Sequence, residues 1–106
     1  MGFLDFLRGP DINQGVSEYQ STDGAVLLDV RTAEEYKGGH IPGSKNIPLD
    51  ALDRVTEVVK EKNTPIFVHC LSGARSARAA AAMKQMGYTN VRNIGGINGY
   101  HGKVER

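Results

Sequence analysis

The chain has 106 residues, of which 40% are hydrophobic and 24% charged, and its 13 basic against 12 acidic side chains give a formal net charge of +1. This length supports one ordinary domain, which we place over residues 1–106, and the balanced charge lacks the basic surplus typical of nucleic-acid-binding domains. The single cysteine excludes an internal disulfide and a multi-cysteine zinc cluster, and no apolar run approaches the roughly 20 residues that a membrane span requires.

The first residues are apolar, but the run is too short for a signal peptide and is interrupted by Asp5. We expect residues 1–9 to form a loosely attached N-terminal segment. The composition predicts a cytoplasmic monomer with no cofactor and no resident metal, and no nucleic-acid or membrane partner.

Short apolar runs then alternate with helical patterns. Residues 25–30 and 65–70 are apolar at nearly every position and too short for helices. Strands that are buried on both faces have this composition, which is typical of a parallel sheet covered by helices on both sides. Three shorter candidate strands, at residues 11–13, 44–47 and 91–94, bring the expected sheet to about five strands.

Helices are predicted between these strands. Thr32 can cap a helix that has acidic residues in its first turn, and Asp50 can cap a helix over residues 51–62. Residues 79–86 have high helix propensity and stop at Gly87, a residue suited to the position after a helix end. The alternation predicts an α/β fold with three layers, whose ligands bind beyond the carboxyl ends of the strands.

Cys70 ends one predicted strand and is followed by a short loop and an alanine-rich helix. Backbone amides of such a loop can converge on an anion, and the helix start adds its positive end. Gly73 permits the tight turn, Arg75 adds a positive charge, and Ser72 and Ser76 add hydroxyl groups. A thiol held there should have a lowered pKa and act as a nucleophile, whereas a cysteine outside such a setting is usually a small buried hydrophobe. The candidate substrate-binding residues are Leu71, Ser72, Gly73, Ala74, Arg75 and Ser76.

Four segments together resemble the rhodanese family of single-domain sulfurtransferases. They are CLSGARS at residues 70–76, DVR with EEY at 29–36, GHIPGSKNIP at 39–48 and GGINGY at 95–100. The resemblance runs in the same order along nearly the whole chain from residue 11, and it implies the three-layer rhodanese-like fold. Tyr100 stands where the family often has tryptophan, and few residues follow it. We therefore expect a short C-terminal helix and looser packing beneath the loop.

The resemblance also implies a mechanism. Cys70 would take the outer sulfur of a small anionic donor such as thiosulfate, hold it as a persulfide and pass it to cyanide, a thiol or a partner protein's cysteine. No second cysteine exists to resolve the persulfide within the chain. For Asp29, Arg31 and His40 we expect structural support of the loops, for example an ion pair between Arg31 and a glutamate of the following helix.

Two other functions remain open at this point. A cysteine and an arginine on one loop also serve phosphatases and arsenate reductases, although the related phosphatases of this fold use a loop one residue longer than Cys70 to Arg75. The domain could alternatively be a persulfide carrier or interaction module that does not turn over. His69 adjoins Cys70 but should face the other side of its strand, so it is a poor base for the thiol.

Overall fold

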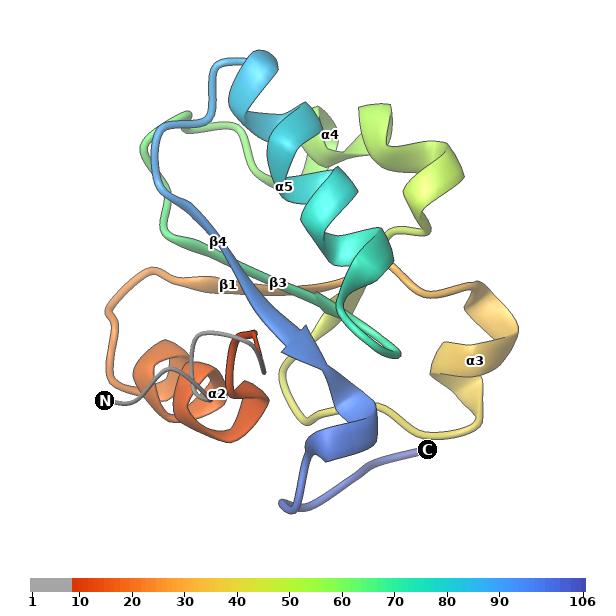
Figure 1. Cartoon of the computed structure of the whole chain (residues 1–106). Helices are drawn as coiled ribbons and strands as arrows, with labels where there is room; N and C mark the ends of the chain where they lie inside the picture. The colour runs from red at the N-terminus through yellow and green to blue at the C-terminus, as the bar shows by residue number, and fades with distance from the viewer. Residues whose placement is uncertain (1–8) are drawn as a thin grey trace.

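The computed structural model describes residues 9–106, which form an α/β fold with one parallel sheet (Figure 1). The strands are β1 (Val26–Asp29), β2 (Lys45–Asn46), β3 (Ile66–Cys70) and β4 (Val91–Gly96), in the spatial order β2-β1-β3-β4. The sheet of the described residues has four strands rather than the expected five or so. The chain moves outward from β1 to β2 and then returns to β3, so the carboxyl ends of β1 and β3 flank the point where the strand order reverses. Ligand sites of open parallel sheets lie at such points.

The prediction of a strand at residues 11–13 is wrong, because this segment starts helix α2 (Ile12–Gln20). The Asp11 side chain accepts a hydrogen bond from the Asn13 amide at 2.9 Å and so caps the helix. Ile12, Gly15 and Val16 follow at helical spacing and are buried. A side chain on Gly15 would collide with Ile94 of β4, so α2 lies directly on the sheet.

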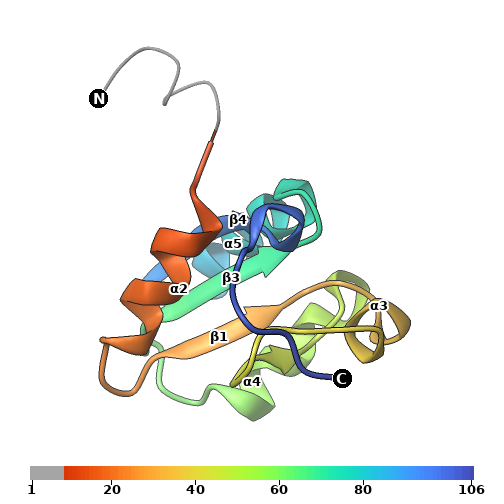
Figure 2. The same cartoon turned by 90° about the horizontal axis from the view of Figure 1, so that it is seen from below.

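Helices cover both faces of the sheet, as expected from the apolar strands. Helix α2 lies on one face, and α4 (Val55–Val58) and α5 (Ala74–Gln85) lie on the other, as Figures 1 and 2 show. The larger core, on the α4 and α5 side, includes Val68, Val55 and Met83, each with no exposed surface. The smaller core, on the α2 side, includes Leu27, Phe67 and Ile94.

The predicted helix over residues 51–62 is broken in two. A 3-10 helix, η1 (Leu49–Arg54), follows Pro48 and is kinked at Ala51, and α4 then makes one turn before Val59 becomes extended. Apolar positions here have helical spacing, but β-branched residues oppose a long helix. These residues are Val55, Thr56, Val58 and Val59.

The helix predicted at 79–86 starts earlier, at Ala74, directly after the cysteine loop. It ends as predicted, with Gly87 at a φ of 102° after the last turn. Helix α3 (Ala33–Lys37) is capped by Thr32 as predicted, and η2 (Ile97–Gly99) is a single turn, which confirms the short C-terminal helix. Within residues 9–106 no helix has the length and apolar character needed to cross a membrane. The prediction for residues 1–9 falls outside the described residues except for Gly9.

Candidate active site

Cys70 lies at the carboxyl end of β3, and the loop that follows curls around its sulfur. The Gly73 amide donates to Sγ at 3.0 Å, and the Ser76 amide donates to it at 3.4 Å. The Ser76 hydroxyl is also 3.4 Å from Sγ. Cys70 is only 1% exposed, so the sulfur lies at the base of a ring of hydrogen-bond donors.

Glycines in the loop and at the end of β4 give the loop this shape. Gly73 has a φ of 103°, a left-handed conformation that residues with side chains rarely adopt, and it places the start of α5 directly beside the sulfur. Gly96 of β4 lies against the loop backbone, because an added Cβ would collide with the Leu71 carbonyl oxygen and lie 2.6 Å from Ser72 Cα. The glycine pair at residues 95–96 therefore lets the loop pack on β4.

The donors around the sulfur favour its ionised form. Burial alone raises the pKa of the Cys70 thiol, but hydrogen bonds from the Ser76 hydroxyl and from the amides of Ser76, Gly73 and Ser72 outweigh burial. The net result is a pKa below the usual value of a cysteine. The thiolate is stabilised by neutral dipoles of the loop and the start of α5.

Arg75 is held by Glu35 of α3, which the sequence did not predict. Its guanidinium forms a two-pronged ion pair with Glu35, with distances of 2.7 Å and 3.0 Å, and both side chains are about a third exposed. The Glu35 carboxylate also accepts from the Thr32 amide at 2.9 Å. The hydrogen bonds from Arg75, despite partial burial and with help from Thr32, lower the pKa of Glu35 to about 2. One carboxylate thus caps α3 and fastens it to the cysteine loop.

Asp29 and Arg31 form a buried ion pair at the end of β1, so the suggested pairing of Arg31 with a glutamate of α3 is wrong. Arg31 Nη2 lies 2.7 Å from Asp29 Oδ2 and also donates to the Gly39 carbonyl at 2.8 Å. Asn46 of β2 donates to the carbonyl oxygens of Asp29 and Arg31. These contacts tie the end of β1 to β2 and to the loop that precedes β2.

Two histidines lie near these loops. His69 is fully buried, with Nε2 3.9 Å from Asp29 Oδ2, and burial lowers its pKa. Its strand position turns it away from the side of Cys70. His40 stacks on the Tyr36 ring at 3.8 Å and places Nδ1 2.9 Å from the Tyr36 carbonyl oxygen, while its backbone pairs with Glu105. His69 therefore lies beside the Asp29 carboxylate, and His40 packs on Tyr36 of α3.

Asn93 is a site residue that the sequence did not single out. Its Oδ1 lies 2.7 Å from the Ser76 hydroxyl and accepts from the Gly95 amide at 3.0 Å, and its Nδ2 donates to the Gly73 carbonyl at 3.3 Å. It therefore joins β4 to both ends of the loop turn. The available signal was a polar side chain in the short candidate strand that precedes the glycine pair.

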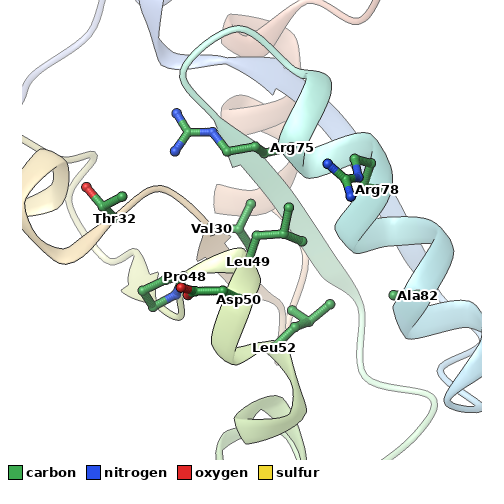
Figure 3. A pocket seen from close by; sticks show the side chains of 9 residues that line it. All are labelled: Val30, Thr32, Pro48, Leu49, Asp50, Leu52, Arg75, Arg78 and Ala82. Atoms are coloured by element: carbon green, nitrogen blue, oxygen red, sulfur yellow. The ribbon is translucent and has the colours of Figure 1, made fainter.

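A cavity of about 620 Å³ lies beside the loop, between η1 and α5 (Figure 3). Val30, Leu49 and Leu52 form an apolar surface, and Arg75 and Arg78 of α5 line the same space. Among residues 9–106 no group of three or more histidine, cysteine or acidic side chains is arranged to hold a metal ion.

The chain is similar to several known proteins. A family model described as "Rhodanese-like domain" matches residues 13–103. The chain is 39% identical over 71 residues to the thiosulfate sulfurtransferase PspE of Escherichia coli, covering 66% of this chain and 68% of that protein. It is 40% identical over 86 residues to the putative sulfur carrier protein YrkF of Bacillus subtilis, covering 80% of this chain and 46% of that protein.

A solved structure described as "rhodanese with anions from E. coli" is 34% identical and superposes with a TM-score of 0.73, covering 77% of this chain and 98% of the other. The chain spans 46% to 68% of the length of three curated relatives that it matches.

Proposed function

The chain belongs to the rhodanese-like family, and from that premise we propose that it is a sulfurtransferase that carries sulfane sulfur as a persulfide on Cys70. The observation that carries the proposal is the buried Cys70 sulfur, which receives hydrogen bonds from Gly73 and Ser76. The names of PspE and YrkF describe a thiosulfate sulfurtransferase and a putative sulfur carrier, which supports sulfur chemistry at this site.

In the first step the Cys70 thiolate attacks the outer sulfur of thiosulfate. A bond forms between Sγ and that sulfur, the sulfur–sulfur bond of thiosulfate breaks, and its electron pair leaves with sulfite. Cys70 is 1% exposed, which favours a donor whose reacting sulfur is a slim terminal atom. The loop amides that face Sγ would stabilise the negative charge of the thiolate and of the persulfide that replaces it.

In the second step an external acceptor takes the sulfur. Cyanide, a small thiol or a cysteine of a partner protein attacks the outer sulfur of the persulfide, and the electron pair of the broken bond returns to Cys70 as a thiolate. An external acceptor is required because the chain has one cysteine. We assign donor binding to the loop from Leu71 to Ser76, and positioning of the loops to Asp29, Arg31 and His40.

Mass spectrometry tests the proposal directly. Incubation of the protein with thiosulfate should add the mass of one sulfur atom at Cys70, and cyanide should remove that mass and release thiocyanate. Cys70→Ser is nearly isosteric and should abolish both changes while leaving the fold intact. If sulfur is added to Cys70 but neither cyanide nor thiols remove it, the protein is a carrier that needs a dedicated protein partner. Unchanged thiocyanate production by Cys70→Ser would refute the mechanism.

A further inference from the structure

The cavity between η1 and α5 begins at the cysteine loop and has a mixed lining. Its volume of about 620 Å³ falls within the range of small-molecule sites. Leu49 and Leu52 of η1 and Ala82 of α5 give it apolar walls, and Arg75 belongs both to the cavity and to the loop that holds Cys70. A molecule in this groove therefore lies next to the site of sulfur transfer.

Two charged side chains that line the groove, Arg78 and Asp50, form no ion pair within residues 9–106. Arg75 is occupied by Glu35, and Figure 3 shows its guanidinium directed toward the Thr32 side, away from Arg78. Arg78 is exposed, lines the groove and forms no ion pair with any residue of 9–106. Asp50 lies with Pro48 at the wall across from α5. The α5 wall therefore favours an anion, and the η1 wall disfavours one.

The spacing along α5 gives the groove a direction. Arg75, Arg78 and Ala82 follow one another at three- and four-residue intervals and so lie on one helix face. With a rise of about 1.5 Å per residue, the helix carries the groove roughly 10 Å from Arg75 to Ala82. An extended chain that enters at the loop thus has apolar side chains beside it and Arg78 within reach.

We propose that this groove binds the sulfur acceptor, and that the preferred acceptor is an unbranched aliphatic thiol that ends in a carboxylate. The inference rests on the proposed sulfurtransferase function and names the acceptor class of the same site. The aliphatic chain would contact Leu49 and Leu52, and the carboxylate would bind Arg78. The acceptor thiol gives its proton to the anionic Cys70 persulfide, and the resulting thiolate attacks the outer sulfur, so that a new sulfur–sulfur bond forms. The bond to Sγ breaks, its electrons return to Cys70, and the acceptor leaves as a persulfide.

Discharge kinetics with a series of acceptors test the inference. The kcat/KM of mercaptoacetate, 3-mercaptopropionate and 6-mercaptohexanoate should rise by up to about fourfold for each methylene that is buried. The acid 6-mercaptohexanoate should exceed the neutral 6-mercaptohexanol by about threefold, because Arg78 is exposed and its ion pair is screened. Arg78→Gln should reduce this ratio to about one, and Asp50→Asn should increase it. Arg54→Gln is the matched control, since Arg54 is exposed and does not line the groove, and it should leave the ratio unchanged.

A binding experiment separates the inference from the proposed function. Titration with hexanoate, which cannot accept sulfur, should shift the backbone amide NMR signals of Leu49 and Ala82 more strongly than titration with hexanamide, and Arg78→Gln should remove the difference. Hexanoate binding without sulfur loading from thiosulfate would refute the proposed function and leave the groove assignment standing. Sulfur loading with no hexanoate shifts, or with no dependence on acceptor chain length and charge, would overturn the acceptor assignment alone.

Discussion

Gly96→Ala is the sharpest test of how β4 shapes the cysteine loop. Gly96 has ordinary extended backbone angles, so alanine is acceptable to its own backbone. The added Cβ, however, would lie 2.6 Å from Ser72 Cα and collide with the Leu71 carbonyl. Carbon atoms in contact need about 3.5–4.0 Å, so the loop or the strand must move by roughly 1 Å. Movement of the loop would carry the amides of residues 72–73 away from the Cys70 sulfur.

The expected cost has two parts. Overpacking of this kind destabilises by about 1–3 kcal/mol, which lowers Tm by at least about 4 °C in a domain of this size. A displacement of about 1 Å at a reacting group can reduce its rate about 100-fold, so sulfur loading from thiosulfate should slow by up to that factor. The assays are thermal unfolding by circular dichroism and the rate of mass increase at Cys70.

Gly99→Ala is the matched control for this substitution. Its Cβ would lie 3.7 Å from Ile12 Cγ2, an ordinary contact, and the change should have little effect on either measurement. Wild-type stability together with wild-type loading in Gly96→Ala would refute the view that contact between β4 and the loop positions the nucleophile.

Three further predictions concern the loop and its neighbours. Alkylation of Cys70 by iodoacetamide should show a midpoint below the ordinary thiol value of about 8.5, and Ser76→Ala should raise it; a wild-type midpoint at or above 8.5 would contradict the assigned hydrogen bonds. Because Glu35 has a pKa of about 2, lowered from 4.5, its stabilising contribution is complete above about pH 4.5 and is lost as the pH falls toward 2. Glu35→Gln should lower the free energy of unfolding by about 1 kcal/mol at pH 7, and urea titrations should then show a weaker loss of stability between pH 4.5 and 2. An unchanged loss of stability in this pH range would mean that a group other than Glu35 causes it. Hydrolysis of p-nitrophenyl phosphate and reduction of arsenate should both be poor beside thiosulfate turnover, and one glycine inserted after Gly73 should improve phosphate ester hydrolysis. Efficient hydrolysis by the unmodified chain would contradict the importance of loop length.

The sequence predicted the sheet and the tight loop between Cys70 and a helix because both depend on neighbouring residues. The strands at 26–29 and 66–70 are mostly apolar on both faces. A strand that is buried on both faces can therefore be recognised from its residue types. The loop combines one cysteine, one glycine and a helix start within a few residues. The failures arose where two local tendencies compete. A cap at Asp11 turned a candidate strand into a helix, and β-branched residues shortened a helix whose apolar spacing was correct.

Contacts between distant residues were beyond the reach of sequence patterns. Arg75 and Glu35 are 40 positions apart, and Ser76 and Asn93 are 17 apart. Each pair meets only because the carboxyl ends of parallel strands share one edge of the sheet. The sequence contains several acidic side chains that could pair with Arg75 and several polar side chains that could pair with Ser76, and residue type alone does not select the partner.

The neutral hydrogen-bond donors and the charged side chains of the site lie in different places and have different effects. Around the Cys70 sulfur the donors are neutral amides and a hydroxyl in a closed loop, where low solvent access strengthens each dipole. The charged groups, Arg75 and Arg78, lie at the exposed rim, where solvent screens them and where Glu35 already neutralises one. Substitutions at the rim should therefore change which donor or acceptor is selected, and substitutions that move the loop backbone should change the reactivity of Cys70. Raising the ionic strength extends the same distinction, because salt should weaken discrimination between anionic and neutral acceptors while leaving the alkylation midpoint of Cys70 nearly constant.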